Sequence, residues 1–316
     1  MKGDFMSDAK IPSAKIRFRG RSLKEILNSH SMWLDGKGGE RANLGDASFA
    51  YADLRNADLR QAIIYGTSFW EADLSHTDLS GAVLEKCDFR NAILTRTDFT
   101  GAEISDAIFQ YSLISDANLS KAHMRRLVFR DADMRDSRFY EVHAKACDFS
   151  NANLRSAHFN HAIMTECCFT ESNLEKCNFL RARFHSCRFI AARFIVANLN
   201  SIVAWDCDFR GAEFNSAKLN LARLGQNTFC GAVMTNCDLR ESNLCAADFS
   251  GAILHNSTFG ETNVTATDFR GSVLEGARGL TGQQLSQSLT SLKTVLPSGT
   301  RGPFIKEENS EISFLG

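Results

Sequence analysis

The chain has 316 residues, of which 44% are hydrophobic and 23% charged, and its 36 Lys/Arg against 37 Asp/Glu give a formal net charge of −1. No apolar run is long enough to cross a bilayer, and we find neither a signal peptide nor a lipidation motif. We therefore expect a cytoplasmic protein with no membrane partner and no direct nucleic-acid binding.

Two short segments precede the regular part of the chain. Residues 1–21 are basic and polar, which predicts a flexible tail. The segment Ser22–Glu25 has the pattern of a capping box, so we expect residues 22–41 to form a short helix followed by a glycine-rich turn. Leu23 and Leu27 lie four residues apart on one face of this helix and would cover the start of the next segment.

Residues 42–276 follow a five-residue period. Every fifth residue from Leu44 to Leu274, here called a centre, is Leu, Phe, Ile, Met or Val in 47 consecutive pentapeptides, except at Ala144 and Ala204. Two residues before the centre, 43 of the 47 positions hold Ala, Cys, Ser or Thr. A period of five fits neither an α-helix nor a single strand, so it predicts an all-β solenoid.

A second period of 20 residues indicates how the solenoid is coiled. Twelve centres spaced 20 residues apart, from Phe49 to Phe269, are all Phe, and we call this set the phenylalanine column. Identical residues at this spacing indicate four pentapeptides per coil, with one face of stacked rings. Layers about 4.8 Å apart would make about twelve coils a rod of roughly 55 Å.

The repeat, as in the pentapeptides ADLRN at 52–56 and ADLRQ at 57–61, resembles that of the pentapeptide-repeat family. The resemblance implies a right-handed quadrilateral β-helix whose centres and small residues point inward, while the other three positions point outward. Proline would interrupt the bonds between coils, and the only three prolines lie outside the repeat, at Pro12, Pro297 and Pro303.

The segment after the repeat resembles the segment before it. Residues 277–297 contain a second capping box at Thr281–Gln284, which predicts a C-terminal capping helix to about Leu292. Leu285 and Leu289 would lie with Leu292 on the face that covers the last coil. Residues 298–316 are rich in Gly, Ser and charge, which predicts a second flexible tail.

The ten cysteines raise the question of a metal site. Seven occupy the inward small position: Cys87, Cys147, Cys167, Cys177, Cys187, Cys207 and Cys237. Four of these form one straight column, whereas zinc needs ligands arranged as a tetrahedron. We therefore predict reduced thiols that serve as small core side chains, with no metal and no cofactor. The other three, Cys168, Cys230 and Cys245, would point outward.

Stacked polar residues raise the question of catalysis. His123 and His143 share one outward column, and Asp58, Asp78 and Asp98 share another. Stacked like charges can perturb pKa values, as at active sites. These columns are also where the repeat places its outward polar residues, and an unbroken register leaves no inserted loop to form a cleft. We predict a solvated ladder, no catalytic residues and no enzyme.

Ala144 and Ala204 are centres without bulk. Both lie in the same column, where the long or large neighbours Met124, Met164 and Phe184 could fill the missing volume. We interpret the pair as compensated packing, with a local bend of the rod as the alternative.

The outward surface changes character in the middle of the chain, where arginine and apolar residues replace acids and amides. Exposed apolar clusters mark interaction sites, and Trp with Arg is typical of binding hot spots. We therefore predict a protein-binding surface at Arg183, Ile190, Ile195, Val196, Val203 and Trp205. Arg183 and Arg223 could make cation–π contacts with Trp205. A second basic belt covers residues 121–138, and a contact between two copies of the chain would use the first surface equally well.

These features favour a non-enzymatic structural or interaction protein that presents a rigid rod to a macromolecular partner, most simply a protein. The resemblance suggests an alternative, a DNA mimic that binds DNA gyrase and gives resistance to topoisomerase inhibitors. Mimicry needs a strongly negative surface, whereas the repeat has a net charge of −6 over residues 42–276. A secreted bacterial effector that binds a host protein is a second alternative.

Overall fold

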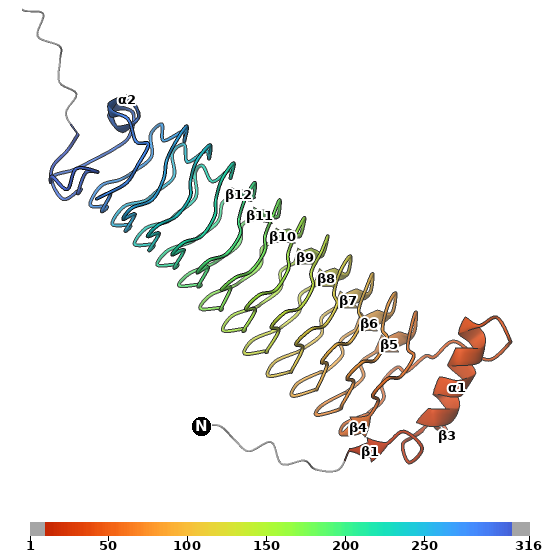
Figure 1. Cartoon of the computed structure of the whole chain (residues 1–316). Helices are drawn as coiled ribbons and strands as arrows, with labels where there is room; N and C mark the ends of the chain where they lie inside the picture. The colour runs from red at the N-terminus through yellow and green to blue at the C-terminus, as the bar shows by residue number, and fades with distance from the viewer. Residues whose placement is uncertain (1–9, 305–316) are drawn as a thin grey trace, which may run out of the picture.

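The computed structural model describes residues 10–304, which form a long rod with a short helix at each end (Figure 1). The parts of the two predicted tails at residues 1–9 and 305–316 lie outside the described residues. The rod is a parallel β-solenoid, which confirms the predicted solenoid class. Residues 20 apart are paired along its whole length, from Asn43 with Ile63 to Thr258 with Arg278. Four pentapeptides therefore complete one coil.

One side of the rod is a continuous sheet (Figure 1). Its eight parallel strands are β5 (Ile63–Tyr65), β6 (Val83–Glu85), β7 (Glu103–Ser105), β8 (His123–Arg125), β9 (His143–Lys145), β10 (Ile163–Thr165), β11 (Arg183–His185) and β12 (Val203–Trp205). Each strand contains a centre with one outward residue on either side. Each strand pairs with the next at an offset of 20 residues, and this register does not shift from β5 to β12.

The other three sides are built mainly from turns joined by isolated bridges. In many of these turns Asp or Asn precedes the centre. Its side chain accepts a hydrogen bond from the backbone N–H two residues later, as Asp73 does from Ser75 at 3.0 Å. Such bonds favour turns over strands. None of β5–β12 has Asp, Asn, Ser or Thr at this position. Ile93 and Ile108 lie in turns without such a bond, so the stacked neighbouring coils also impose the turn.

The core is a stack of apolar layers. Between Phe69 and Phe249, successive rings of the phenylalanine column lie 4.6–4.9 Å apart. The spacing widens to 5.7 Å at the Phe49 end and 5.8 Å at the Phe269 end. All twelve rings are buried, as the sequence predicted. Because each ring fills its own layer and contacts the next, the column aligns one coil on another.

The missing bulk at Ala144 and Ala204 is supplied from within the same pentapeptide. The inward position two residues earlier, usually small, holds Val142 before Ala144 and Ile202 before Ala204, both at most 1% exposed. Pairing of the strands continues through both alanines, from Met124 to Ala144 and from Phe184 to Ala204. The β-branched residues thus add buried volume at both sites, a source that the sequence interpretation did not consider. Filling by Met124, Met164 and Phe184 stays a prediction.

The N-terminal cap begins earlier than predicted. Within the segment expected to be a flexible tail, β1 (Ile11–Pro12) pairs in parallel with β4 (Ala52–Asp53). β2 (Arg17–Phe18) and β3 (Arg21–Ser22) form a small hairpin. The prediction of a tail to residue 21 is thus wrong for the described part, because the open edge of the first coils offers unpaired backbone groups that this segment satisfies.

The helix α1 (Leu23–Leu34) has the predicted capping box, since the Ser22 and Glu25 side chains each bond the other's backbone N–H. Leu23 is fully buried, and Leu27 is partly buried against the core. His30, also buried, accepts the Ala42 N–H at Nδ1 (3.0 Å) and contacts the Arg60 carbonyl through Nε2 (3.0 Å). These bonds join the helix to the first two coils.

The C-terminal cap differs from the predicted helix. The second capping box is present, but α2 (Gly282–Ser286) ends long before Leu292. Leu289 instead donates its N–H to the Thr267 carbonyl, and Val295 donates to Ser272, so the chain makes one more partial coil. Of the three leucines expected on the covering face, Leu285 is buried, whereas Leu289 and Leu292 are 49% and 80% exposed. Backbone pairing with the last open edge outweighs helix formation here.

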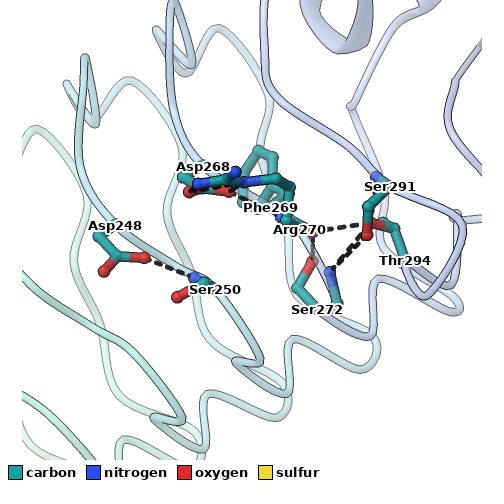
Figure 2. A network of polar contacts seen from close by, with 9 residues as sticks. Asp248, Ser250, Asp268, Phe269, Arg270, Ser272, Ser291 and Thr294 are labelled. Carbon is teal, nitrogen blue, oxygen red and sulfur yellow. Dashed lines mark hydrogen bonds and ion pairs between the residues drawn. The ribbon is translucent and has the colours of Figure 1, made fainter.

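Side chains join this partial coil to the repeat (Figure 2). The buried Thr294 hydroxyl donates to the Phe269 carbonyl at 2.9 Å and accepts the Gly271 N–H at 3.2 Å. Ser291 accepts the same N–H at 3.2 Å. The chain then turns back, with Val295 bridged to Arg301 and Phe304 packed on the core. Residues 298–304 therefore belong to the cap, and the predicted tail is wrong for this part.

Replacing Phe149 by Ala tests the phenylalanine column. Its ring stacks 4.9 Å from Phe129 and 4.7 Å from Phe169, and it is fully buried. We expect a loss of about 3–5 kcal/mol in the free energy of unfolding, measured by urea denaturation. Phe149→Leu is the control and should cost much less, because it keeps most of the volume. An unchanged midpoint for Phe149→Ala would contradict the register.

Candidate interaction surface

The sheet of β5–β12 presents sixteen outward side chains in two straight columns, which we call the strand face. The column before the centres holds Ile63, Val83, Glu103, His123, His143, Ile163, Arg183 and Val203. The column after them holds Tyr65, Glu85, Ser105, Arg125, Lys145, Thr165, His185 and Trp205. Both ends of the strand face are apolar, its glutamates lie in β6 and β7, and its Arg, Lys and His lie in β8–β11. The face is therefore polarised along the rod.

An open groove of about 470 Å³ lies along the middle of the strand face, over Met124 and Ala144. The rings of His123 and His143 stack on one side of it, with centroids 5.1 Å apart and planes 9° apart. Their stacking confirms the predicted column. Arg125 and Lys145 line the other side. Lys145 lies 3.6 Å from Glu166. Glu85 and Glu103 also line the groove, which therefore has acidic residues toward β6 and β7 and basic residues at β8 and β9.

A second open groove, of about 330 Å³, lies where the sheet ends at β12. It is lined by Val203 and Trp205, together with Arg223 and Gly225 of the next coil. The Trp205 side chain is 52% exposed, and its ring meets His185 edge-on at 6.4 Å. The expected cation–π contact of this ring with Arg183 or Arg223 is not found among the described residues. An indole that is half exposed at the end of a sheet is a suitable anchor for a partner.

Asn227 supports this second groove from inside and was missed by the sequence interpretation. Its amide donates to the carbonyls of Ala204 at 2.9 Å, Leu224 at 2.9 Å and Gly225 at 3.1 Å. Its Oδ1 accepts the N–H of Cys207 at 2.8 Å. A signal was present, because Asn227 is the one polar amide among the 47 inward small positions. It fixes the backbone where strands give way to turns.

The six residues predicted to bind a partner do not form one patch. Arg183, Val203 and Trp205 lie together on the strand face, where Arg183 pairs with Val203 across adjacent strands. Ile195 follows His185 by ten residues, which is half a coil, so Ile195 and Val196 lie on the opposite side of the rod. Ile190 lies on the side between them.

The basic belt at 121–138 also differs from the arginines beside Val203. In the belt at 121–138, Arg126, Arg130 and Arg135 pair with Asp106, Asp148 and Asp133 at 2.5–2.7 Å. By contrast, Arg183 and Arg223 have no ion pair within residues 10–304. Exposed ion pairs contribute little stability, but they do neutralise charge. The unpaired arginines beside Val203 therefore carry more free positive charge than the paired ones.

The cysteines divide as predicted into seven buried and three partly exposed thiols. Burial raises the pKa of Cys87 and of Cys237 to about 12. In the column of four, hydrogen bonds between neighbouring thiols, together with burial, raise the pKa of Cys167 and Cys207. Cys168 differs: although burial raises its pKa, hydrogen bonds with Ser150 and Thr170, both at 3.3 Å, lower it overall.

The aspartate column is arranged for structure. Asp58 bonds Arg60 at 2.7 Å, and this bond lowers the pKa of the Asp58 carboxyl. Asp78 and Asp98 accept backbone N–H groups two residues on, at 2.9 and 2.8 Å. Within residues 10–304 no group of three or more His, Cys, Asp or Glu side chains is arranged to hold a metal ion. Neither helix of the described chain is long and apolar enough to span a membrane.

Comparison with protein families agrees with this geometry. The family profile described as pentapeptide repeats matches overlapping segments from 42–81 to 247–278, which together cover most of the chain. The chain belongs to the pentapeptide-repeat family. No curated protein matches the sequence significantly.

Several solved structures are similar at low identity. HetL from the cyanobacterium Nostoc sp. strain PCC 7120, involved in heterocyst differentiation regulation, is 18% identical, with 86% of this chain and 96% of HetL covered and a TM-score of 0.30. Full-length QnrB1, a plasmid-mediated fluoroquinolone resistance protein, is 19% identical, with 68% and 91% covered and a TM-score of 0.25.

Replacing Asn227 by Ala tests its supporting role. The change leaves the buried Cys207 N–H and three carbonyls without this partner, so we expect a loss of about 1–3 kcal/mol in the free energy of unfolding. Urea denaturation measures it. Asn263→Ala, at an exposed position of the same repeat, is the control and should change little. Equal, small effects for both variants would argue against the role of Asn227.

Alkylation of the native protein tests the division of the thiols. A lowered pKa gives Cys168 a larger thiolate fraction near neutral pH, so iodoacetamide should label it fastest. Thr170→Val removes one hydrogen bond to its sulfur and should slow the reaction. Mass spectrometry of the labelled peptides measures the rates. Rapid labelling of Cys167 or Cys187 in the folded protein would overturn the assignment of the inward thiols.

Proposed function

We propose that this pentapeptide-repeat protein is a non-enzymatic scaffold, a right-handed quadrilateral β-helix of about twelve coils that binds a protein partner in the cytoplasm. The observation that carries the proposal is the end of the strand face. There Trp205 and Val203 lie beside two arginines, Arg183 and Arg223, that have no ion pair within the described residues. Exposed apolar and aromatic side chains next to unpaired arginines are the composition of a binding hot spot.

The interior of the rod supports a non-catalytic role. The centres and most of the small inward side chains are apolar, and the polar inward residues bond the backbone, as Thr77 does to the Leu54 carbonyl at 2.8 Å. The grooves of the strand face are open and shallow, so they would not exclude water from a reacting group. A rigid lattice of outward positions is suited to presenting side chains at fixed spacing.

The charge of the strand face also separates this proposal from DNA mimicry. A mimic of DNA would present acids along its length. On this face β8–β11 contribute Arg125, Lys145 and Arg183, while the acids Glu85 and Glu103 are confined to β6 and β7. A purified chain that inhibited supercoiling by DNA gyrase would favour the gyrase reading over a general scaffold.

The test is a pull-down from the source lysate with matched variants. Trp205→Ala combined with Val203→Asp should lose a partner that the wild type retains, because both side chains line the groove at the end of the sheet. Ile195→Glu, on the opposite side of the rod, should retain it. Circular dichroism and thermal melting should be nearly unchanged in both, since none of these residues is in the core. Loss with Ile195→Glu and retention with the other variant would refute the strand face as the site.

A further inference from the structure

The strand face has a pattern that a single acidic or basic partner does not explain. Apolar side chains lie at both ends: Ile63, Tyr65 and Val83 near the N-terminus, and Val203 and Trp205 near the C-terminus. Between them the charge changes sign, from the glutamates of β6 and β7 to the basic residues of β8–β11. Two pairs lie at equal distances on either side of β9: the apolar Val83 and Val203, and the oppositely charged Glu103 and Arg183. A two-fold axis converts this kind of pattern into complementary contacts.

We infer that the strand face binds the strand face of a second copy of this chain, with the two rods antiparallel. The two-fold axis would run parallel to the strands through β9 (His143–Lys145), so that each column faces the same column of the second copy in reverse order. Val83 then faces Val203 of the second copy, and Glu103 faces Arg183 of the second copy. Both matches follow from one placement of the axis, and the apolar and charged pairs agree on it.

The next outward column, two residues after each centre, supports the same axis. Lys86 faces Asp206 of the second copy, and Arg126, which already pairs with Asp106 of its own chain, faces Glu166 of the second copy. Ala146, the residue on the axis, faces its own equivalent, so no charge or bulk is opposed there. At the end of the face, the exposed ring of Tyr65 faces Gly225, where a side chain is absent.

The central strand also has to be compatible with the axis. His143 and Lys145 each face their own equivalents, which places two lysine ammonium groups opposite each other. Glu166 already lies 3.6 Å from Lys145 and offsets part of that charge. The groove over Ala144 leaves room beneath the two histidines. In the outer strands, Glu85 faces Trp205 of the second copy, and Lys86 at 3.0 Å offsets the charge of Glu85. The favourable pairs of the outer strands are Val83 with Val203 and Glu103 with Arg183.

The area of the strand face indicates how strongly two copies should associate. Eight strands about 4.8 Å apart make a face roughly 40 Å long and about 12 Å wide, or about 500 Å² per copy. A standard stable interface buries about 800 Å² per partner, so this one falls in the weak class. We therefore expect a dimer that dissociates on dilution and at high salt, because screening weakens its exposed ion pairs.

An acidic protein segment is the other occupant that the basic strands would accept. It would pair with Arg125, Lys145 and Arg183 but would be repelled by Glu85 and Glu103, whereas a second copy places Arg183 opposite Glu103. The inference rests on the proposed function, because it names the partner of the same face. The two can fail separately: a strictly monomeric chain whose lysate partner depends on Trp205 would refute the dimer alone.

Analytical ultracentrifugation of the full chain over a wide range of concentration is the first test. Wild type should show a monomer–dimer equilibrium that Arg183→Glu and Glu103→Arg each weaken at least about tenfold, a loss of about 1.4 kcal/mol. The double variant Glu103→Arg/Arg183→Glu should restore the association, because the exchanged charges again face each other. Arg193→Glu makes the same change on the opposite side of the rod and should leave the dimer intact. A monomer at every concentration, or no recovery in the double variant, would overturn the inference.

Cross-linking tests the position of the axis independently. Facing sheets pack about 10 Å apart, so a bismaleimide of about that reach should join two copies of Ala146→Cys. Ala246→Cys places a thiol at the same position of the repeat five coils away and should give no more dimer than wild type, which controls for the outward cysteines. Efficient linking of Ala246→Cys with none of Ala146→Cys would show that the copies associate in another register, and would refute this axis.

Discussion

The backbone bonds between coils are the constraint on which the rest of this structure depends. Each coil supplies N–H and C=O groups that only the coils above and below can satisfy, and they do so at a strict offset of 20 residues. A single inserted residue would move every later side chain to another position of the repeat. The inward volume must therefore balance within each coil, which is why Val142 and Ile202 accompany the two small centres.

The same constraint explains which predictions from sequence succeeded. The solenoid, the phenylalanine column and the buried thiols all follow from a period that the core enforces at every coil. The caps were less predictable, because an open edge accepts any segment that can pair its backbone. Ile11–Pro12 pairs with the first coils although its composition resembles a tail, and Leu289 pairs with Thr267 although its spacing from Leu285 fits a helix.

The interaction surface could be predicted only in part, because outward positions carry no packing constraint and so no period. Arg183, Val203 and Trp205 were selected correctly as neighbours, since they are about one coil apart. Ile195 and Val196 were grouped with them because they are close in sequence, yet ten residues lead to the opposite side of the rod. In a solenoid with this coil length, surface neighbours are residues 20 apart, and a patch has to be sought along columns. Asn227 can be found by the same comparison, because the other residues of its column are not amides.

A rod with a fixed layer spacing also restricts what can bind along its length. A partner that contacts several coils must present groups at multiples of about 4.8 Å over tens of ångströms, which few irregular surfaces do. A second copy of the same rod meets this requirement without any adjustment, because its columns have the same spacing. The matches then depend only on the order of residues within a column. On the strand face that order places Glu103 and Arg183 at equal distances from β9, and Val83 and Val203 at equal distances beyond them. The regularity that stabilises the core thus makes the face able to recognise itself.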